Sequence, residues 1–428
     1  AMTEKSTWVS LAVLAGVLAG CPSREVSQID PHQQRTERID IKIGVNRDVD
    51  LLFVVDNSLS MAQEQVLLAD NFPAFIDVLA NVPGGLPNLH LGVVSSDTGT
   101  GAYNIPNAHC LGMGDDGAMQ DRPRVLNCNP PLDPYPYIID VDDGQGQGGR
   151  TQNYNGGNLA DTFACIAQLG DQGCGFEQHL ESMKRALDGR NAGFLRETAL
   201  LAVIFIADED DCSASDTNVF DHTQTNLNDP VGPLSSFRCT EYGVSCNGGN
   251  IARSPNAVTY SNCEPRANSP YIYHPDHYVD FLYSLKPGLP ENIVVAGILG
   301  NPTPFSVGPD VTTPTNPDLQ PSCSSVSGDA DPAVRLNYFL NQFPDRGTFT
   351  TICQNDLTDA LIQVAELVEV ALGDPCLKSR IVQNDLFPND PGLQLDCSVS
   401  DVLNAGLPTQ EDFPLPRWSQ LTTMNSPS

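Results

Sequence analysis

Two polar segments, each following an apolar run, carry residue types that bind metal ions. The first is Asp56, Ser58 and Ser60, directly after the apolar residues 51–55. A carboxylate and two hydroxyls in one short turn are all oxygen donors, and hard oxygen donors favour Mg²⁺, Ca²⁺ or Mn²⁺ over softer metals. A single carboxylate leaves such an ion under-neutralised and hydrated, so an incoming carboxylate could complete its coordination.

The second segment is the acidic run at residues 208–211, which follows the apolar residues 200–207. If both apolar runs are parallel strands, their carboxyl ends meet at one edge of the sheet, where the ligand sites of open α/β sheets lie. We therefore expect Asp56 and Asp208 to face one cleft. The remaining acidic residues of the run are expected at the surface.

Hydrophobic patterns indicate the elements that position these residues. Apolar runs without alternation are typical of strands buried on both faces of a parallel sheet. Alternation of such runs with helical patterns predicts an α/β fold with a doubly wound, mostly parallel central sheet flanked by helices. The expected strands are residues 51–55, 89–94, 200–207 and 293–298. Helices are expected over 61–79, where Pro73 should start, end or kink an element, over 176–187, after Pro275 and Pro332, and from Asn355 or Asp356 to Leu372.

Two long stretches, residues 98–160 and 212–270, are rich in Gly, Asn, Asp and Pro and interrupt this pattern. Loops of that length are unusual unless they are functional, and cysteines within them could hold them by disulfides. We therefore expect one domain over residues 49–373 with two disulfide-stapled loop insertions. Residues 374–428 are expected to form an irregular tail.

The N-terminal residues 1–21 have the pattern of a secretion signal, with Lys5 before an apolar run that is too short to span a bilayer. Leu-Ala-Gly-Cys21 resembles the bacterial lipobox, which implies acylation of Cys21; the alternative is ordinary secretion with a free Cys21. Residues 22–48 are polar and predict a flexible tether. We expect an exported protein, lipid-anchored in the cell envelope at the outer membrane, on its periplasmic face or at the cell surface.

The cysteine count agrees with export. Of 13 cysteines, twelve remain after Cys21 is set aside, and an even number in an exported chain indicates disulfides. No Cys-x-x-Cys pair is present, which argues against zinc. Sequence does not determine connectivity, but pairing of near neighbours would join 110 with 128, 165 with 174, 212 with 239, 246 with 263, 323 with 353 and 376 with 397.

Composition and missing motifs exclude several classes of function. A formal net charge of −31 repels nucleic acid and anionic lipid headgroups and suits divalent cations. The glycine-rich residues 144–149 do not follow a strand, and no Walker loop is present, so no nucleotide site is expected. The signatures Gly-x-Ser-x-Gly and His-Glu-x-x-His are missing as well.

With these residues in view, the chain resembles a von Willebrand factor A domain with a metal-ion-dependent adhesion site, as in uncharacterised bacterial lipoproteins of that type. Asp56, Ser58 and Ser60 match the Asp-x-Ser-x-Ser motif of that site, and Asp208 matches the aspartate after the fourth strand, which usually acts through water. The resemblance covers roughly residues 49–373. It implies a divalent cation, Mg²⁺ first and otherwise Ca²⁺ or Mn²⁺, and a protein partner that offers a Glu or Asp carboxylate.

The resemblance has one departure. Family members usually carry a threonine ligand in the loop before the third helix, and the corresponding residues 173–178 contain none. Glu177 could supply the missing oxygen, or it could equally be a charge that complements the start of a helix. Thr162 is a weaker substitute, because it stands on the other side of Cys165.

Three functions remain open. The resemblance implies a non-enzymatic adhesion or scaffold module whose insertions set specificity. A metal-dependent hydrolase could use Asp56 with Asp208, Asp210 and Asp211, but two-metal chemistry usually needs histidines, and none of the seven is expected near either motif. A structural envelope protein with a degenerate metal site is the third possibility, and the missing threonine favours it.

Overall fold

The computed structural model describes residues 46–82, 84–126, 128–145, 148–154, 158–372, 400–403 and 411–414. The predicted signal peptide, the predicted acylation of Cys21, most of the predicted tether and the predicted pairing of Cys376 with Cys397 lie outside the described residues. The chain divides into a large unit, Gly44–Val382, and a second unit formed by the terminal segments. The described part of the second unit is an antiparallel hairpin of β16 (Ser400–Leu403) and β17 (Glu411–Pro414), where we expected an irregular tail.

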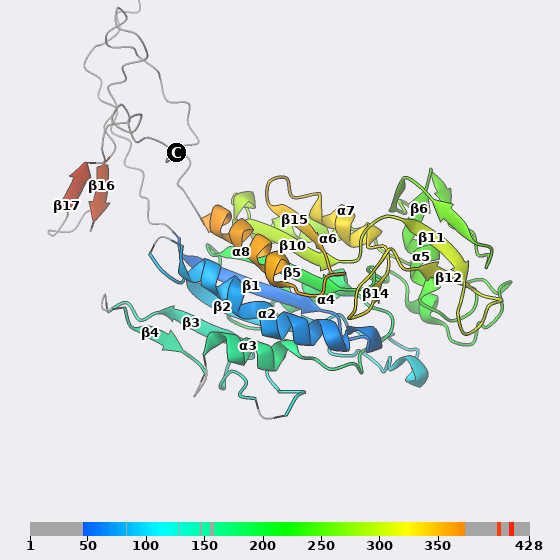
Figure 1. The fold of residues 1–428 in the computed structure, drawn as a ribbon, viewed down its shortest axis with the longest axis horizontal. Coiled ribbons are helices and arrows are strands. Elements are labelled where there is room, and N and C mark those ends of the chain that lie inside the picture. Colours follow the sequence, from blue (N-terminus) through cyan, green and yellow to red (C-terminus); the bar gives the residue numbers. More distant parts are fainter. Residues whose placement is uncertain are drawn as a thin grey trace, which may run out of the picture. The chain divides into compact units, whose positions relative to one another are not determined.

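A seven-stranded sheet with the order β15-β10-β5-β1-β2-β3-β4 forms the centre of the large unit (Figure 1). The first five strands in this order are parallel to their neighbours, and the last two are added antiparallel at the edge. The strands are β1 (Asp48–Val55), β2 (Asn88–Ser95), β3 (Ile138–Asp142), β4 (Arg150–Gln152), β5 (Leu200–Ala207), β10 (Ile293–Leu299) and β15 (Gly347–Thr351).

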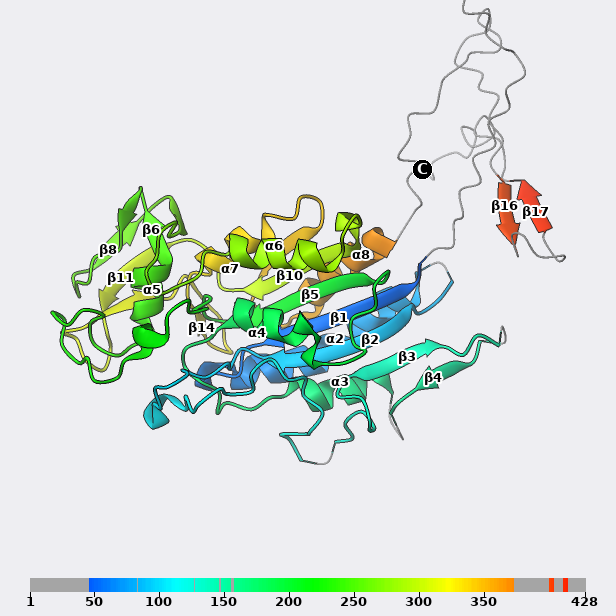
Figure 2. The ribbon, with the colours of Figure 1, turned by 180° about the vertical axis from the view of Figure 1, so that it is seen from behind.

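Helices cover both faces of this sheet because its central strands are apolar on both sides. In β1, Leu51, Phe53 and Val55 pack in one core while Leu52 and Val54 pack in another. The helices of the first core are α2 (Ala62–Ala80), α3 (Leu159–Ala167) and α8 (Thr358–Leu372), seen in front in Figure 1. Those of the second are α4 (His179–Arg185), α6 (Asp276–Leu285) and α7 (Val334–Leu340), with α4 and α6 in front in Figure 2. The prediction of a mixed α/β fold with a largely parallel sheet flanked by helices is confirmed.

Helix ends follow local signals in most places. Pro275 immediately precedes α6, and the Asp356 side chain accepts a 2.7 Å hydrogen bond from the Thr358 backbone N–H at the start of α8. Pro73, by contrast, lies inside the 19-residue helix α2, so it neither starts nor ends that helix. Burial of Phe72 and Phe75 on the sheet outweighs the loss of one backbone hydrogen bond at proline.

The first expected insertion is only partly irregular, because it contributes β3 and β4 to the central sheet. These two strands contain polar and charged residues, so they lack the continuous apolar pattern by which the four central strands were predicted. Asp140 of β3 is buried and pairs with Arg150 of β4, whose guanidinium also donates to the backbone oxygens of Leu86 and Pro87. A charged pair therefore joins this edge hairpin to the sheet. The same segment contains the short helix η2 (Pro106–Ala108).

The second insertion folds together with a segment that we did not assign to it. Strand β8 (Val258–Tyr260) pairs with β11 (Phe305–Pro309), which in turn pairs with β12 (Pro317–Gln320). Phe237, Phe305 and Val307 share a small core. The prediction that the insertion ends near residue 270 was therefore incomplete. Its other elements are η4 (Thr217–Phe220), α5 (Phe237–Gly243), β6 (Val244–Cys246), β7 (Gly249–Asn250) and β9 (Cys263–Pro265). The remaining short elements of the unit are η1 (Leu59–Met61), η3 (Ala186–Arg190), η5 (Pro290–Asn292), β13 (Cys323–Ser324) and β14 (Asp329–Ala330).

Five disulfides staple the described residues. Three expected pairs are confirmed: Cys212–Cys239, Cys246–Cys263 and Cys323–Cys353. Two are wrong, since the actual pairs are Cys110–Cys174 and Cys128–Cys165. A backbone hydrogen bond of 3.0 Å from Gly175 to Ala108 brings the two distant segments together at the first of them. This number of disulfides is typical of a chain that matures outside the cytoplasm. Within the described part of the chain, no helix has the length and hydrophobicity needed to cross a membrane.

Candidate metal site

Asp56 is fully buried at the carboxyl end of β1, where the hydrogen-bonding pattern of the sheet ends. Its backbone N–H makes the last hydrogen bond to the neighbouring β5, donating to the Ile206 backbone oxygen at 2.9 Å. One carboxylate oxygen, Oδ1, accepts from the Ser58 N–H at 2.7 Å and from the Ser96 hydroxyl at 3.3 Å. The other oxygen, Oδ2, accepts no hydrogen bond. Asp56 is therefore held rigidly by one oxygen and presents the other.

Ser58 and Ser60 stand on the turn that leads into α2, and their hydroxyl oxygens are 3.0 Å apart. Two neighbouring ligands of an octahedral ion, each about 2.1 Å from it, also lie about 3.0 Å apart. Ser58 is buried whereas Ser60 is exposed, so the pair connects the buried carboxylate to solvent. The spacing of the two hydroxyls fits a small hard cation.

Asp208 follows β5 and is brought beside the Asp56 loop, as expected from the parallel pairing of β1 with β5. Its carboxylate lies within hydrogen-bonding reach of Ser60, and its Oδ1 has no partner. Burial, followed by the charges of Asp56 and Glu209, raises the pKa of Asp208 well above the ordinary value. A cation between these carboxylates would relieve that repulsion.

Glu177 is buried in the loop before α4, and its carboxyl group lies within hydrogen-bonding reach of Glu209. Its Oε1 has no hydrogen-bond partner, and burial together with Glu209 and Asp56 raises its pKa well above the ordinary value. Thr162 lies elsewhere: its hydroxyl donates to the Asn158 backbone oxygen within α3, at 3.2 Å. Of the two proposed substitutes for threonine, Glu177 alone is brought into this acidic cluster.

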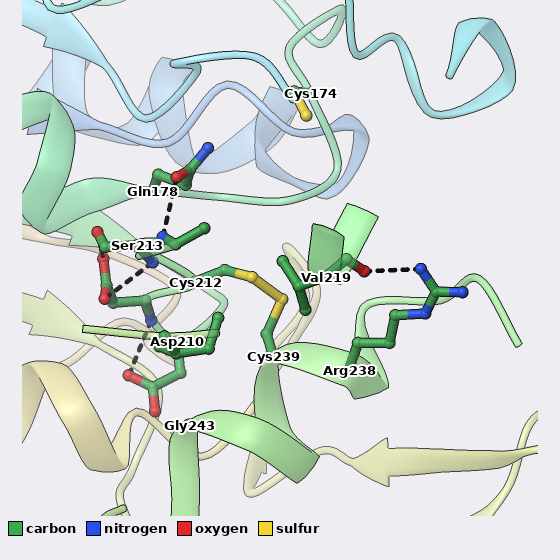
Figure 3. Close-up of a disulfide and its surroundings, with 12 residues drawn as sticks. Cys174, Gln178, Asp210, Cys212, Ser213, Val219, Arg238, Cys239 and Gly243 are labelled. Atoms are coloured by element: carbon green, nitrogen blue, oxygen red, sulfur yellow. Dashed lines mark hydrogen bonds between the residues drawn. A yellow bond between two sulfur atoms is a disulfide. The ribbon is translucent and has the colours of Figure 1, made fainter. Parts of the chain in front are cut away.

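Three neighbouring loops hold the 173–178 segment in place. Gly173 donates to the Asn57 backbone oxygen at 2.8 Å, and the Cys212 N–H donates to the Glu177 backbone oxygen at 2.7 Å. The Gln178 side chain donates to Gly99 at 2.8 Å and accepts from Ala214 at 3.1 Å. Figure 3 shows Gln178 above the chain next to Ser213, with the Cys212–Cys239 disulfide beside it. The site is thus supported by fixed backbone contacts and by cystines.

Asp210 and Asp211 of the acidic run have structural roles. Asp211 is buried and forms a 2.9 Å ion pair with Arg335, while its Oδ1 accepts from the Leu180 N–H at 2.9 Å. Asp210 accepts the backbone N–H groups of Arg335 and Leu336 at the start of α7, at 2.9 and 3.1 Å. The expectation that these residues lie at the surface was wrong for Asp211, because a helix on each side of it donates to its carboxylate. Both groups are occupied in joining α4 and α7 to this loop, which leaves the hydrolase hypothesis without its extra metal-binding carboxylates.

Two residues of the site were missed by the sequence analysis. His179 is fully buried, with its Nε2 only 3.4 Å from Asp56 Oδ2, so the expectation of no histidine near the motif was wrong. Glu64, in the first turn of α2, is buried within reach of Ser327, and one of its oxygens has no partner. Glu64 stands four residues after Ser60, which lies in η1 directly before α2. His179 directly follows residues 173–178, the loop that lacks the expected threonine. Its position next to that loop is the one sequence feature that could have indicated a role in the site.

The side chains present fit a cation held mainly by oxygen. Within the described ranges, no group of three or more His, Cys, Asp and Glu side chains forms a metal centre by itself, so binding would depend on the two serines as well. Buried polar atoms are nearly always hydrogen-bonded. Here Asp56 Oδ2, Asp208 Oδ1 and Glu177 Oε1 are all buried without a partner, on loops at one edge of the sheet. That concentration of unsatisfied acceptors is what a bound cation would satisfy.

Comparisons with known proteins add little beyond this geometry. No protein-family model matches the chain, and no curated protein sequence matches it. The pilus adhesin SpaC from Lactobacillus rhamnosus GG, in its open conformation, is 12% identical with a TM-score of 0.31. A second crystal structure of SpaC is 14% identical, also with a TM-score of 0.31. Each match covers 76% of this chain but only 30% of the adhesin. Similarity at this level assigns neither fold family nor function.

Proposed function

We propose that this protein is a cell-envelope binding module in which a doubly wound domain of the von Willebrand factor A type, over residues 49–373, recruits a protein partner through a divalent cation. One observation carries the proposal. Asp56 and Asp208 follow adjacent parallel strands, and each has a buried carboxylate oxygen without a partner. The paired hydroxyls of Ser58 and Ser60 lie on the turn that directly follows Asp56, and Ser60 is within hydrogen-bonding reach of Asp208. The proposed role is adhesion or scaffolding, without enzymatic turnover.

Each residue has a distinct role in this proposal. Asp56 and the two serines would hold the ion, and Asp208 would act through a water molecule. The cation, Mg²⁺ in the first instance and otherwise Ca²⁺ or Mn²⁺, would supply a positive charge that attracts a carboxylate. Ser60 is the exposed member of the set, so a Glu or Asp side chain of the partner would approach from its side.

Apolar side chains beside the site support a protein ligand. Leu59, between the two serines, is 72% exposed, and Val326 is 85% exposed. Val326, Val66 and Leu67 line a depression of about 390 Å³ next to the start of α2. Exposed aliphatic groups around a charged centre suit a partner segment in which an acidic residue is flanked by an aliphatic one.

The same proposal includes export and anchoring. Signal residues 1–21, acylation of Cys21 and the tether would place the domain at the outer membrane. The five disulfides support an oxidising location, because such bonds persist outside the cytoplasm.

Calorimetric titration of Mg²⁺, Mn²⁺ and Ca²⁺ into the oxidised protein tests the metal site. We expect saturable one-site binding that is lost in Asp56→Ala and weakened at least about tenfold in Ser60→Ala. Ser60 is exposed, so its variant should fold even if the Asp56 variant does not. Ser284→Ala, on the exposed side of α6, is the matched control. Equal binding by wild type and both site variants would mean that the motif is degenerate.

A partner search follows if the metal binds. Candidate envelope or surface proteins would be captured on the immobilised protein with and without chelator, in parallel with Ser60→Ala. Binding that resists chelator and is unchanged in the variant would contradict the adhesion role while leaving the metal site in place.

A further inference from the structure

His179 is a fully buried histidine at the first residue of α4, and neither ring nitrogen has a hydrogen-bond partner among the described residues. Burying a polar group without a partner costs free energy, because the group loses its hydrogen bonds to water. Protein interiors rarely tolerate that cost at both nitrogens of one imidazole. The side chain is therefore positioned for an interaction with something other than a neighbouring protein group.

The position of His179 indicates what that interaction is. Its Nε2 lies 3.4 Å from Asp56 Oδ2, which is the carboxylate oxygen without a hydrogen bond. Two ligands that are each about 2.1 Å from one ion and 3.4 Å from each other subtend an angle of about 105–110°. Such an angle is ordinary for donors that share a metal ion. The other Asp56 oxygen is engaged by Ser58 and Ser96, so the free oxygen faces the imidazole.

An imidazolium paired with Asp56 is the competing explanation. Burial favours the neutral ring, but the adjacent Asp56 carboxylate outweighs this effect and raises the pKa of His179. At 3.4 Å, however, the contact is longer than an ordinary N–H···O hydrogen bond. An imidazolium has two N–H groups to satisfy, whereas an imidazole that binds a metal has only one. The length of the contact and the unpartnered second nitrogen therefore favour a shared ion over a shared proton.

Charge balance points in the same direction. Asp56, Asp208, Glu64, Glu177 and Glu209 interact electrostatically in this cluster. Within the described part of the chain, no ion pair with a lysine or arginine is recorded for any of them. His179 is the basic side chain recorded beside Asp56, and it could carry at most one positive charge. Buried carboxylates without cations are costly. A divalent ion next to His179 would compensate them better than a single proton.

We propose that His179 is a metal ligand through Nε2, so that the site binds its ion with mixed nitrogen and oxygen donors. This inference rests on the proposed function and specifies its ion. Imidazole is a poor ligand for Mg²⁺ and Ca²⁺ but a good one for transition metals, and carboxylates and hydroxyls suit Mn²⁺. The site therefore takes a first-row transition-metal ion of the Mn²⁺ class in preference to Mg²⁺ or Ca²⁺. His179 stands in the loop where the resemblance would place a threonine.

Pulsed electron paramagnetic resonance of bound Mn²⁺ tests this ligand directly. The oxidised full chain would be loaded with one equivalent of Mn²⁺, with free aqueous Mn²⁺ quantified by its continuous-wave signal. We expect ¹⁴N modulation from a coordinated imidazole, which changes to the ¹⁵N pattern when the protein contains ¹⁵N-labelled histidine. This isotope comparison needs no substitution, so it shows whether a histidine binds the ion even if a variant fails to fold.

Variants locate the nitrogen. His179→Gln should abolish the modulation and weaken Mn²⁺ binding by about tenfold or more, with a smaller change for Mg²⁺. His90→Gln is the control, since His90 is a partly buried histidine that also lies near a buried aspartate, Asp50 in β1, and its replacement should keep the signal. Mn²⁺ that binds saturably but shows no nitrogen modulation would overturn the His179 assignment and leave the oxygen site standing. No saturable binding of any of the three ions would overturn the proposed function and this inference together.

Discussion

Gly173 lies so close to Asn57 that no side chain fits between them. A Cβ atom at position 173 would be 2.2 Å from the Asn57 side-chain oxygen and 2.6 Å from its backbone oxygen. The Gly173 N–H uses this approach to donate to the same backbone oxygen, at 2.8 Å. The loop that carries Glu177 and leads to His179 is thereby joined to the loop that carries the candidate metal ligands.

Gly173→Ala should therefore separate the two loops and weaken the metal site. We expect Mn²⁺ and Mg²⁺ affinity to fall by about tenfold or more, because supporting contacts of metal ligands are worth that much. Gly175→Ala is the control: its nearest neighbour would be 3.9 Å from the added Cβ. Calorimetric titration of both variants checks this, and equal affinities would show that the contact does not support the site.

The buried pair of Arg335 and Asp211 should be needed for stability. Arg335→Met leaves the Asp211 charge buried without its cation, and breaking a buried pair from one side costs about 3–5 kcal/mol. Denaturant unfolding of the oxidised protein measures the change. Arg122→Met is the control, because the Arg122 side chain is 92% exposed. This replacement should alter the unfolding free energy by no more than about 0.5 kcal/mol. A loss of similar size in both variants would contradict the role given to Arg335.

Arg196 provides a test at the opposite end of the strands. It donates to the buried Asp50 carboxylate at 2.8 Å, and its own backbone oxygen accepts from Lys286. Arg196→Met should destabilise the protein by about 3–5 kcal/mol for the same reason as Arg335→Met. Metal affinity, measured well below the unfolding transition, should be unchanged because Asp50 lies near the start of β1 whereas Asp56 follows its end. A change in affinity would show that the two ends of the sheet are coupled.

Peptide mapping of the non-reduced protein should reveal the crossed disulfides. Mass spectrometry is expected to find Cys110 joined to Cys174 and Cys128 joined to Cys165. Peptides that join Cys110 to Cys128 would contradict the described arrangement of the first insertion. The Cys110–Cys174 bond matters for the metal site, because Cys174 directly follows Gly173, which contacts the Asn57 loop.

Loss of the Cys110–Cys174 bond should affect metal binding more than loss of Cys246–Cys263. Either double replacement by alanine should cost about 2–4 kcal/mol of stability. Only the first bond is attached to the loop that contains Glu177, whereas the second joins the paired strands β6 and β9 of the small sheet. Equal metal affinity in the two double variants would mean that backbone contacts alone position the loop.

The four central strands expected from the sequence are present because their apolar runs have few other stable environments. A run such as residues 200–207 is buried on both faces wherever it lies, and a parallel sheet between helices meets that need. The placement of Asp56 near Asp208 follows from the same argument, because each residue directly follows a strand and the two strands, β1 and β5, are neighbours in the sheet. Strands β3 and β4 could not be predicted in this way, because buried Asp140 depends on Arg150 and not on an apolar pattern.

What the sequence by itself determined is therefore local: the strands, most helix starts, and the oxygen donors at the ends of β1 and β5. Only the tertiary structure decided which cysteines pair, that Asp211 is buried against Arg335, and that His179 approaches Asp56. The physical reason is the range of the interactions. Periodicity and strand ends are fixed by residues a few positions apart, whereas His179 and Asp56 are separated by more than a hundred residues and meet only when the sheet and its loops have assembled.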